Sequence, residues 1–122
     1  MCATVLVVED EPLIRLHIAS VFAEAGFEVV ETGSGDEAMS FLQSCTNFDV
    51  VFSDIEMPGN TNGMMLCQHI FRTRPSTTVI LSSGKHLPYP KQLPPNARFI
   101  AKPYVPTVLE HAVEELRRQF SR

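Results

Sequence analysis

Three short apolar runs of this chain each end at a charged residue, and this pattern restricts the possible folds more than any other feature. The runs lie at residues 5–8, 50–53 and 99–101. They end at Glu9 and Asp10, at Asp54, and at Lys102, respectively. Short apolar runs of this kind are typical of strands buried in a parallel sheet. The carboxyl ends of parallel strands lie side by side, so the pattern predicts a crevice that holds several carboxylates and one ammonium.

Segments of helical period alternate with these runs. Strands are expected at residues 4–8, 27–31, 49–53, 78–82 and 98–101. Helices are expected to begin near Pro12, Ser34, Met64 and Thr107. Ser34 and Thr107 are each followed three residues later by glutamate, which is capping-box spacing. Apolar residues with helical spacing mark the expected buried faces: Ile14, Ile18, Val21, Phe22 and Ala25; Ala38, Phe41, Leu42 and Cys45; Met64, Cys67, Ile70 and Phe71; Leu109, Ala112, Val113, Leu116 and Phe120.

The alternation of strands and helices predicts an α/β three-layer sandwich, in which helices cover both faces of a parallel sheet and the crossovers are right-handed. One segment interrupts the alternation. Between Gly84 and Ala97 the chain contains four prolines, and a regular helix of several turns cannot pass through them. We expect an extended loop there, with at most one short turn. No internal repeat or second domain is visible, and 122 residues suit a single domain.

The composition argues against several classes of function. The formal net charge is −4, whereas a nucleic-acid-binding protein usually presents a clustered basic face. Arg117 and Arg118 fall in the last turns of an expected helix, where they favourably meet the helix dipole. No apolar stretch approaches the roughly 20 residues of a membrane helix, and no signal peptide is recognisable. We therefore expect a cytoplasmic protein with no direct nucleic-acid partner and no membrane partner.

The cysteines and histidines show no pattern of a zinc site or a disulfide framework. The three cysteines lack CxxC spacing, and Cys45 and Cys67 fall at apolar helix positions, as buried thiols do. The four histidines form no HxxxH or HxH pair. Zinc therefore has little support.

The carboxylates at the strand ends suit a hard cation and a phosphoryl group. Glu9, Asp10 and Asp54 would repel one another when brought close. Mg²⁺ relieves such repulsion, since it takes one or two carboxylates together with waters and phosphate oxygens. The carboxylate of Asp54 can attack phosphorus and form an aspartyl phosphate, and Lys102 can act as a point charge on phosphate oxygens. Ser82, at the end of another expected strand, offers a hydroxyl to the same crevice.

Each of these residues also has an ordinary structural interpretation. Glu9 and Asp10 could match the dipole at the N-terminus of a helix. Asp54 could cap a loop, Lys102 could extend into solvent, and residues 82–84 could form an ordinary turn. The functional interpretation depends on four strand ends carrying mutually suitable groups.

Four motifs of the chain resemble the receiver domain of two-component (phosphorelay) response regulators. They follow one another in the order of that family, and the resemblance covers nearly the whole chain. The motifs are Leu-Val-Val-Glu-Asp-Glu-Pro at 6–12, Asp-Ile-Glu-Met-Pro-Gly at 54–59 with Gly63, Ile-Leu-Ser-Ser-Gly at 80–84 and Ala-Lys-Pro-Tyr at 101–104. The resemblance implies one receiver domain over residues 1–122, with a flavodoxin-like, doubly wound sheet of five parallel strands in the order 2-1-3-4-5. The proline-rich stretch stands where the family has its fourth helix, so we expect that helix to be shortened or replaced by a loop.

The resemblance also implies roles for the charged residues. Asp54 matches the phosphoacceptor, and Lys102 matches the lysine that pairs with the phosphoryl group. Asp10 matches the direct ligand of Mg²⁺ or Mn²⁺, and Glu9 matches a ligand that acts through water. Glu56 stands where the family supplies a backbone carbonyl to the metal, and Asp54 is itself a ligand.

A switch is the other implication of the resemblance. Ser82 matches the switch Ser/Thr, with Ser83 as the other possible register, and Phe99 matches the switch aromatic. A sensor histidine kinase or phosphotransfer protein would donate the phosphoryl group from phosphohistidine, and the resulting movement would change a partner-binding surface. Such a protein is not an enzyme beyond its own phosphorylation and dephosphorylation. Glu56, paired with Lys85, could control the water that attacks the aspartyl phosphate.

Two other functions stay open. Glu9 with the pair Asp54 and Glu56 loosely resembles the Toprim arrangement, which implies a metal-dependent phosphoryl-transfer enzyme. The other function is a receiver-like interaction module that takes no phosphate. The downstream target is unknown and a homodimer is possible. The chain is either a stand-alone receiver or a domain cut from a longer protein.

Overall fold

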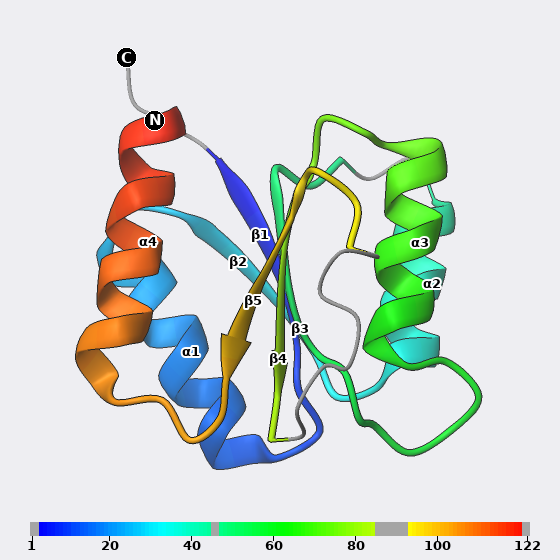
Figure 1. Ribbon diagram of the computed structural model, residues 1–122, viewed down its shortest axis with the longest axis horizontal. Coiled ribbons are helices and arrows are strands. Elements are labelled where there is room, and N and C mark those ends of the chain that lie inside the picture. The colour runs from blue at the N-terminus through cyan, green and yellow to red at the C-terminus, as the bar shows by residue number, and fades with distance from the viewer. Residues whose placement is uncertain (1–2, 45–46, 85–92, 121–122) are drawn as a thin grey trace.

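The computed structural model describes residues 3–44, 47–84 and 93–120 of the chain. Within these residues, five parallel strands form one sheet in the order β2-β1-β3-β4-β5 (Figure 1). The strands are β1 (Thr4–Val8), β2 (Glu28–Thr32), β3 (Val50–Asp54), β4 (Thr78–Ser83) and β5 (Ala97–Ala101). Each lies within one residue of its predicted limits, and the predicted strand order is confirmed.

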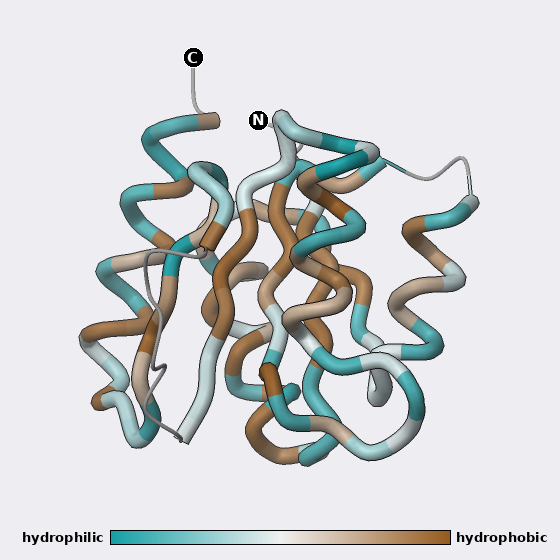
Figure 2. Tube along the Cα trace, turned by 45° about the vertical axis from the view of Figure 1, so that its right-hand side comes forward, coloured by the Kyte–Doolittle hydropathy of each residue, from teal (hydrophilic) through white to brown (hydrophobic). Residues whose placement is uncertain are grey.

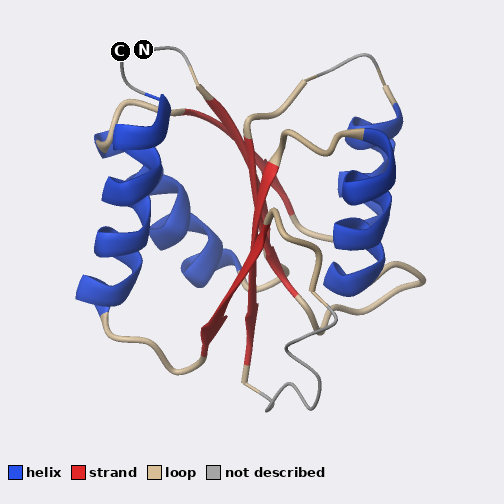
Figure 3. Ribbon diagram, turned by 45° about the horizontal axis from the view of Figure 1, so that its top comes forward, coloured by secondary structure: helices blue, strands red, loops and turns tan. Residues whose placement is uncertain are grey.

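The helices lie in two layers, one on each face of the sheet (Figure 3). In the described part of the chain they are α1 (Pro12–Glu24), α2 (Gly35–Gln43), α3 (Gly63–Thr73) and α4 (Pro106–Phe120). Figure 1 shows α1 and α4 on one face and α2 and α3 on the other, which is the predicted three-layer sandwich. Among the residues that the structure describes, no helix is both long enough and apolar enough to cross a membrane.

The sheet divides the hydrophobic core into two halves. Successive residues of a strand point to opposite faces, so Val5 and Val7 pack with Ile18 on the side of α1 and α4, whereas Leu6 and Val8 pack on the side of α2 and α3. All five side chains are fully buried. Figure 2 shows the resulting concentration of hydrophobic residues along the central strands. Burial on both faces explains why these strands are continuous apolar runs in the sequence.

The helix ends follow from local sequence. The side chain of Ser34 accepts a hydrogen bond from the N–H of Glu37 at 3.1 Å and caps α2, as predicted. Pro12 lies in the first turn of α1, where its missing N–H costs nothing. Gly26 follows α1 with a φ of 96°, a conformation that favours glycine and ends the helix.

Some expectations about the helices are wrong. The helix α4 begins at Pro106, so Thr107 lies inside its first turn and does not cap it. Ile14 and Phe71 were expected on buried faces but are 39% and 42% exposed. The buried stripes of α1 and α3 are rotated toward Ala19 and Leu66, which leaves the apolar residues on the other flank in contact with water.

The remaining expectations concern a thiol and the proline-rich stretch. Cys67 is buried as predicted, and burial raises its pKa to about 11. Cys45 lies outside the described residues, as do residues 85–92 of the proline-rich stretch. The described part of that stretch, residues 93–96, contains no helix.

Candidate functional site

Three carboxylates meet at the carboxyl ends of β1 and β3. Glu9 and Asp10 directly follow β1, and Asp54 is the last residue of β3. These strands are neighbours, with Val8 paired to Ser53, so the residues at their ends lie side by side. One carboxylate oxygen of each acid lies within 4.8 Å of the corresponding oxygens of the other two. The structure therefore brings together the three acids that the sequence predicted to meet.

Lys102 completes this group from the edge of the sheet. It directly follows β5, and its backbone N–H donates to the carbonyl of Ser83 at the end of β4, at 2.8 Å. Its ammonium nitrogen lies 3.1 Å from Oδ2 of Asp54 and 3.4 Å from Oε1 of Glu9. The Lys102–Pro103 peptide bond is cis. One ammonium thus faces two carboxylates.

Burial dominates the electrostatics of the site. Glu9 is 2% exposed and Asp54 is 7% exposed, and burial raises the pKa of both carboxyls. The N–H of Glu11 and then the charge of Lys102 oppose this rise at Glu9, and Lys102 opposes it at Asp54. Burial acts to lower the pKa of Lys102, but its hydrogen bond to Asp54 and the charge of Glu9 outweigh burial and raise it. Three carboxylates share the site with one ammonium, so negative charge remains in excess. A further cation would reduce the repulsion among the carboxylates.

Two residues near the start of α1 hold Glu9 in place. The N–H of Glu11 donates to Oε2 of Glu9 at 3.0 Å, and the guanidinium of Arg15 donates to the backbone carbonyl of Glu9 at 2.9 Å. Arg15 also forms an ion pair with Glu31 of β2, at 3.5 Å. Arg15 was not among the site residues predicted from the sequence. A basic residue in the first turns of a helix that follows an acidic strand end is the signal that could have indicated it.

The donor set suits a hard divalent cation. Glu9, Asp10 and Asp54 offer carboxylate oxygens, which Mg²⁺ and Mn²⁺ accept readily. Two of these acids are buried and Asp10 is exposed, so a cation held here would keep water on its open side. Mg²⁺ loses its waters reluctantly, so a site that leaves room for several waters suits it.

The family model of the response regulator receiver domain matches residues 5–114 of the chain. The chain belongs to the response regulator receiver domain family. This confirms the family predicted from the four sequence motifs. The matched residues include the three acids and Lys102 that meet at the strand ends.

Proteins of different kinds are similar to the chain. The chain is 32% identical over 118 residues to the sensor kinase CckA of Brucella abortus, covering 93% of this chain and 12% of that protein. It is 41% identical over 86 residues to a protein-glutamate methylesterase/protein-glutamine glutaminase of Agrobacterium fabrum, covering 69% of this chain and 24% of that protein. The chain thus spans a quarter or less of the length of these relatives.

A solved receiver structure shows the same fold. The response regulator TrrA of Thermotoga maritima, determined in complex with Mg²⁺-BeF, is 30% identical to this chain with a TM-score of 0.76. The match covers 93% of this chain and 98% of that one.

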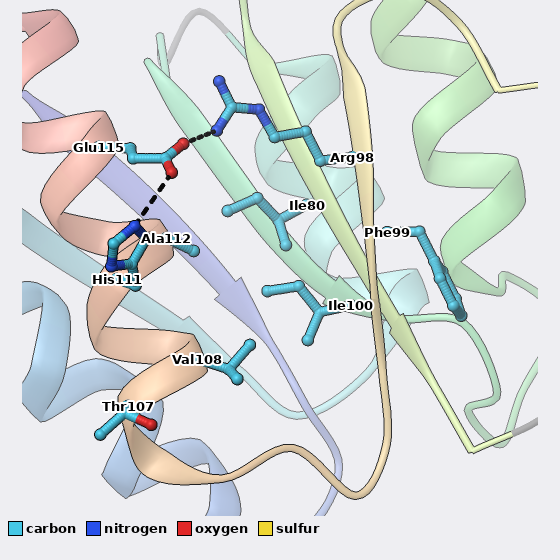
Figure 4. Close-up of a pocket in the computed structure, with 9 residues that line it drawn as sticks. All are labelled: Ile80, Arg98, Phe99, Ile100, Thr107, Val108, His111, Ala112 and Glu115. Atoms are coloured by element: carbon cyan, nitrogen blue, oxygen red, sulfur yellow. Dashed lines mark hydrogen bonds and ion pairs between the residues drawn. The ribbon is translucent and has the colours of Figure 1, made fainter.

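Two adjacent serines at the end of β4 point to opposite faces of the sheet. Leu81 pairs with Phe99 of β5, and both pack on the side of α2 and α3. Ser83 follows Leu81 by two residues and therefore shares the face of Phe99, whereas Ser82 shares the face of Ile80 beside α1 and α4. Figure 4 shows the same alternation on β5, where Phe99 points away from Ile80.

The hydroxyls of these serines have different surroundings. The Ser82 hydroxyl is buried and, within the described parts of the chain, has no hydrogen-bond partner. The Ser83 hydroxyl donates to both carboxylate oxygens of Glu56, at 2.6 and 2.8 Å. The pairing of Glu56 with Lys85 that we expected falls outside the described residues, since Lys85 is not among them.

A groove of about 490 Å³ opens between β5 and α4 (Figure 4). Ile80 and Ile100 line its floor, and Glu115 at its rim pairs with Arg98 at 3.0 Å and with His111 at 3.6 Å. The acids and the lysine of the receiver site do not line this groove. We therefore treat it as separate from the site.

Proposed function

We propose that this receiver domain, residues 1–122, is a phosphoacceptor switch. It takes a phosphoryl group onto Asp54 from a phosphohistidine of a sensor histidine kinase or phosphotransfer protein. The observation that carries this proposal is the position of the Asp54 carboxylate, 3.1 Å from the ammonium of Lys102 and within 4.8 Å of ligand atoms of Glu9 and Asp10. A nucleophile beside a counter-charge and a set of metal ligands suits phosphoryl transfer.

In the proposed step, a carboxylate oxygen of Asp54 attacks phosphorus. The P–N bond to the donor imidazole breaks, and its electron pair stays on the imidazole nitrogen. Asp10 would hold Mg²⁺ or Mn²⁺ directly and Glu9 through water, with Asp54 and the backbone carbonyl of Glu56 as further ligands. The cation, when bound, supplies positive charge to the phosphoryl oxygens. Lys102 stabilises the negative charge that develops on the same oxygens in the transition state.

We propose no enzymatic activity beyond the protein's own phosphorylation and dephosphorylation. The methylesterase relative is an enzyme in which the matched region is only 24% of the length. The charged groups of the site are accounted for by metal binding, nucleophilic attack and charge neutralisation at Asp54.

The hydroxyl that follows the phosphoryl group is, in this proposal, that of Ser82, which the sequence pattern favours. Ser82 of β4 is paired with Asp54 of β3, so their side chains share one face of the sheet. The Ser82 hydroxyl is buried and has no hydrogen-bond partner in the described parts of the chain, which leaves it available to a phosphoryl oxygen. Phosphorylation would thereby shift the population of Phe99 orientations and change a partner-binding surface.

The start of α1 offers a surface for the phosphoryl donor. Leu13 and Leu16 are 76% and 60% exposed, and adjoining exposed apolar side chains indicate interaction sites. Leu13 also lines a pocket of about 400 Å³ together with Lys102 and Pro103. A donor protein that buried these leucines would present its phosphohistidine close to Asp54, so we propose that the kinase or phosphotransfer protein docks here.

Incubation with Mg²⁺ and acetyl phosphate, followed by measurement of the intact mass, tests the proposal. We expect a phosphoryl adduct on the wild type and none on Asp54→Asn, and EDTA should abolish the adduct. The absence of an adduct, even with the cognate kinase, would favour an interaction module that takes no phosphate. Hydrolysis of nucleic acid or of phosphodiesters would favour the Toprim-like enzyme.

A further inference from the structure

The peptide that joins Glu9 to Asp10 lies just beyond the hydrogen-bond ladder between β1 and β2. The N–H of Glu9 donates to the carbonyl of Thr32, the last residue of β2, at 3.1 Å. The carbonyl of Glu9 accepts instead from the guanidinium of Arg15 in α1, at 2.9 Å. A side chain thus supports the backbone at the point where the support from β2 ends.

This carbonyl belongs to the same planar unit as the N–H of Asp10, because the atoms of a peptide from one Cα to the next lie close to one plane. A hydrogen bond to the carbonyl therefore fixes the direction in which the chain leaves Glu9 and enters Asp10. Asp10 is exposed, so the packing of the core does not hold it. The position of its carboxylate depends on the backbone that carries it.

We propose that Arg15 is a positioning residue for the divalent cation: by fixing the peptide between Glu9 and Asp10, it holds both acids where one cation can use them. The inference rests on the proposed function, in which these acids bind Mg²⁺ or Mn²⁺. Arg15 offers no ligand atom of its own, since a guanidinium has only donors. Replacing a residue that orients metal ligands in this way commonly weakens metal binding by about 10- to 100-fold.

Glu31 of β2 directs Arg15 toward this peptide. Its carboxylate pairs with Nε of Arg15 at 3.5 Å, while another nitrogen of the guanidinium, Nη1, donates to Glu9. The rigid fork of an arginine offers two such nitrogens, whereas a lysine has a single one. The glycine at position 33 leaves room for the fork, since a Cβ there would lie 3.2 Å from Nη1.

The charge of Arg15 allows positioning to be separated from simple electrostatics. A guanidinium near a divalent cation repels it, so by charge alone the loss of Arg15 would tighten cation binding. Positioning has the opposite consequence, since without Arg15 the two acids are no longer held together. The sign of the change in affinity therefore decides between the two effects.

Titration of the metal-free protein with Mg²⁺, without any phosphoryl donor and followed by amide chemical shifts in NMR spectra, measures this affinity. Arg15→Met keeps an unbranched side chain but has no donor, and it should weaken binding about 10-fold. Glu31→Gln should weaken binding by no more than about fivefold, as expected for a partly exposed ion pair. The matched control is Arg98→Met, which breaks the ion pair with Glu115 at the other edge of the sheet and should bind as the wild type does.

Arg15→Lys keeps the charge and one donor, so it should recover only part of the affinity that Arg15→Met loses. It also carries the test if Arg15→Met does not fold, because charge alone predicts no change for this variant. Binding by Arg15→Met that equals or exceeds that of a wild type that binds Mg²⁺ would overturn the inference, as would unchanged binding by Arg15→Lys. A wild type that binds no Mg²⁺ would instead reject the metal site of the proposed function, and the positioning role with it.

The backbone provides a second readout that needs no metal. The order parameter of the Asp10 amide, from ¹⁵N relaxation of the metal-free protein, should fall in Arg15→Met because the peptide loses its tether. It should stay unchanged in Arg98→Met. An Asp10 amide that is equally rigid with and without the Arg15 guanidinium would overturn the inference, even in a variant whose Tm is lowered.

Discussion

The ammonium nitrogen of Lys102 lies 3.1 Å from Oδ2 of Asp54, although β4 separates the strands from which these two residues extend. The same nitrogen lies 3.4 Å from Glu9. Lys102 therefore neutralises part of a buried negative charge in the unmodified protein. A phosphoryl group on Asp54 would be placed beside the same ammonium, so one residue serves both the resting and the phosphorylated site.

Replacement of Lys102 by Met should slow phosphorylation of Asp54 by acetyl phosphate about 100-fold, which is a usual effect of removing one group that stabilises transition-state charge. Met retains an unbranched side chain but has no charge. The rate is measured by intact mass over time at saturating Mg²⁺. Arg118→Met removes a cation whose side chain is 74% exposed and should leave the rate unchanged. A rate for Lys102→Met close to that of the wild type would contradict the proposed role.

Neutralising Asp54 should stabilise the metal-free protein at neutral pH. Burial raises the pKa of this carboxyl above its usual value of 3.8, so the folded state binds the proton more tightly than the unfolded state does. Proton binding by Asp54 therefore contributes to the free energy of unfolding. This contribution is fully present below the pKa of Asp54 in the unfolded state and is lost as the pH rises through its pKa in the folded state. The difference in unfolding free energy between Asp54→Asn and the wild type should therefore be smallest in acid and should grow toward neutral pH.

Urea unfolding in EDTA at a series of pH values measures this difference. Mg²⁺ should then stabilise the wild type more than Asp54→Asn, because the cation uses the carboxylate that the variant lacks. A difference in stability that stays constant with pH would show that Asp54 titrates alike in the folded and unfolded states.

Ser82 and Ser83 should respond differently to loss of the hydroxyl. Ser82→Ala removes a buried hydroxyl that has no partner among the described residues, so it should be neutral or stabilise the fold by up to about 1 kcal/mol. The same substitution should diminish the chemical-shift change that beryllofluoride causes at Phe99 in NMR spectra, because Ser82 is the residue paired with Asp54. Ser83→Ala should leave most of that change. The reverse pattern would assign the switch hydroxyl to Ser83.

The strand ends and the charged cluster could be predicted from sequence because strands buried on both faces stop sharply at the first charge. Parallel pairing then brings Glu9, Asp54 and Lys102 together without further information. The directions of Ser82 and Ser83 could not be obtained in this way, because a shift of one residue moves a side chain to the other face of a sheet.

The contacts made by loops could not be predicted from the sequence either. The hydrogen bond between Glu56 and Ser83 joins positions 27 residues apart, and no periodicity of the sequence encodes it. The contact of Arg15 with the backbone carbonyl of Glu9 likewise depends on the angle at which α1 leaves β1. Periodic patterns determine which face of an element is buried, whereas these contacts depend on how the elements are joined.

The close approach of α3 to the end of β3 should make Gly63 sensitive to substitution. A Cβ at this position would collide with the carbonyl oxygen of Asp54 and would lie 2.8 Å from Cα of Ile55. Gly63 cannot simply move away, because its N–H donates to the carbonyl of Ile55 at 3.0 Å. Gly63→Ala should therefore cost about 1–3 kcal/mol of stability, and it should slow phosphorylation by displacing the backbone of Asp54.

Gly84→Ala is the matched control for this substitution. Among the described residues, no atom lies within 4 Å of a Cβ added at Gly84, so the same change of residue type meets no obstacle from them. Urea unfolding and the rate of adduct formation with acetyl phosphate should both separate the two variants. Equal stability and equal rates would mean that α3 can shift away from β3 without moving Asp54, and that the position of the phosphoacceptor does not depend on this packing.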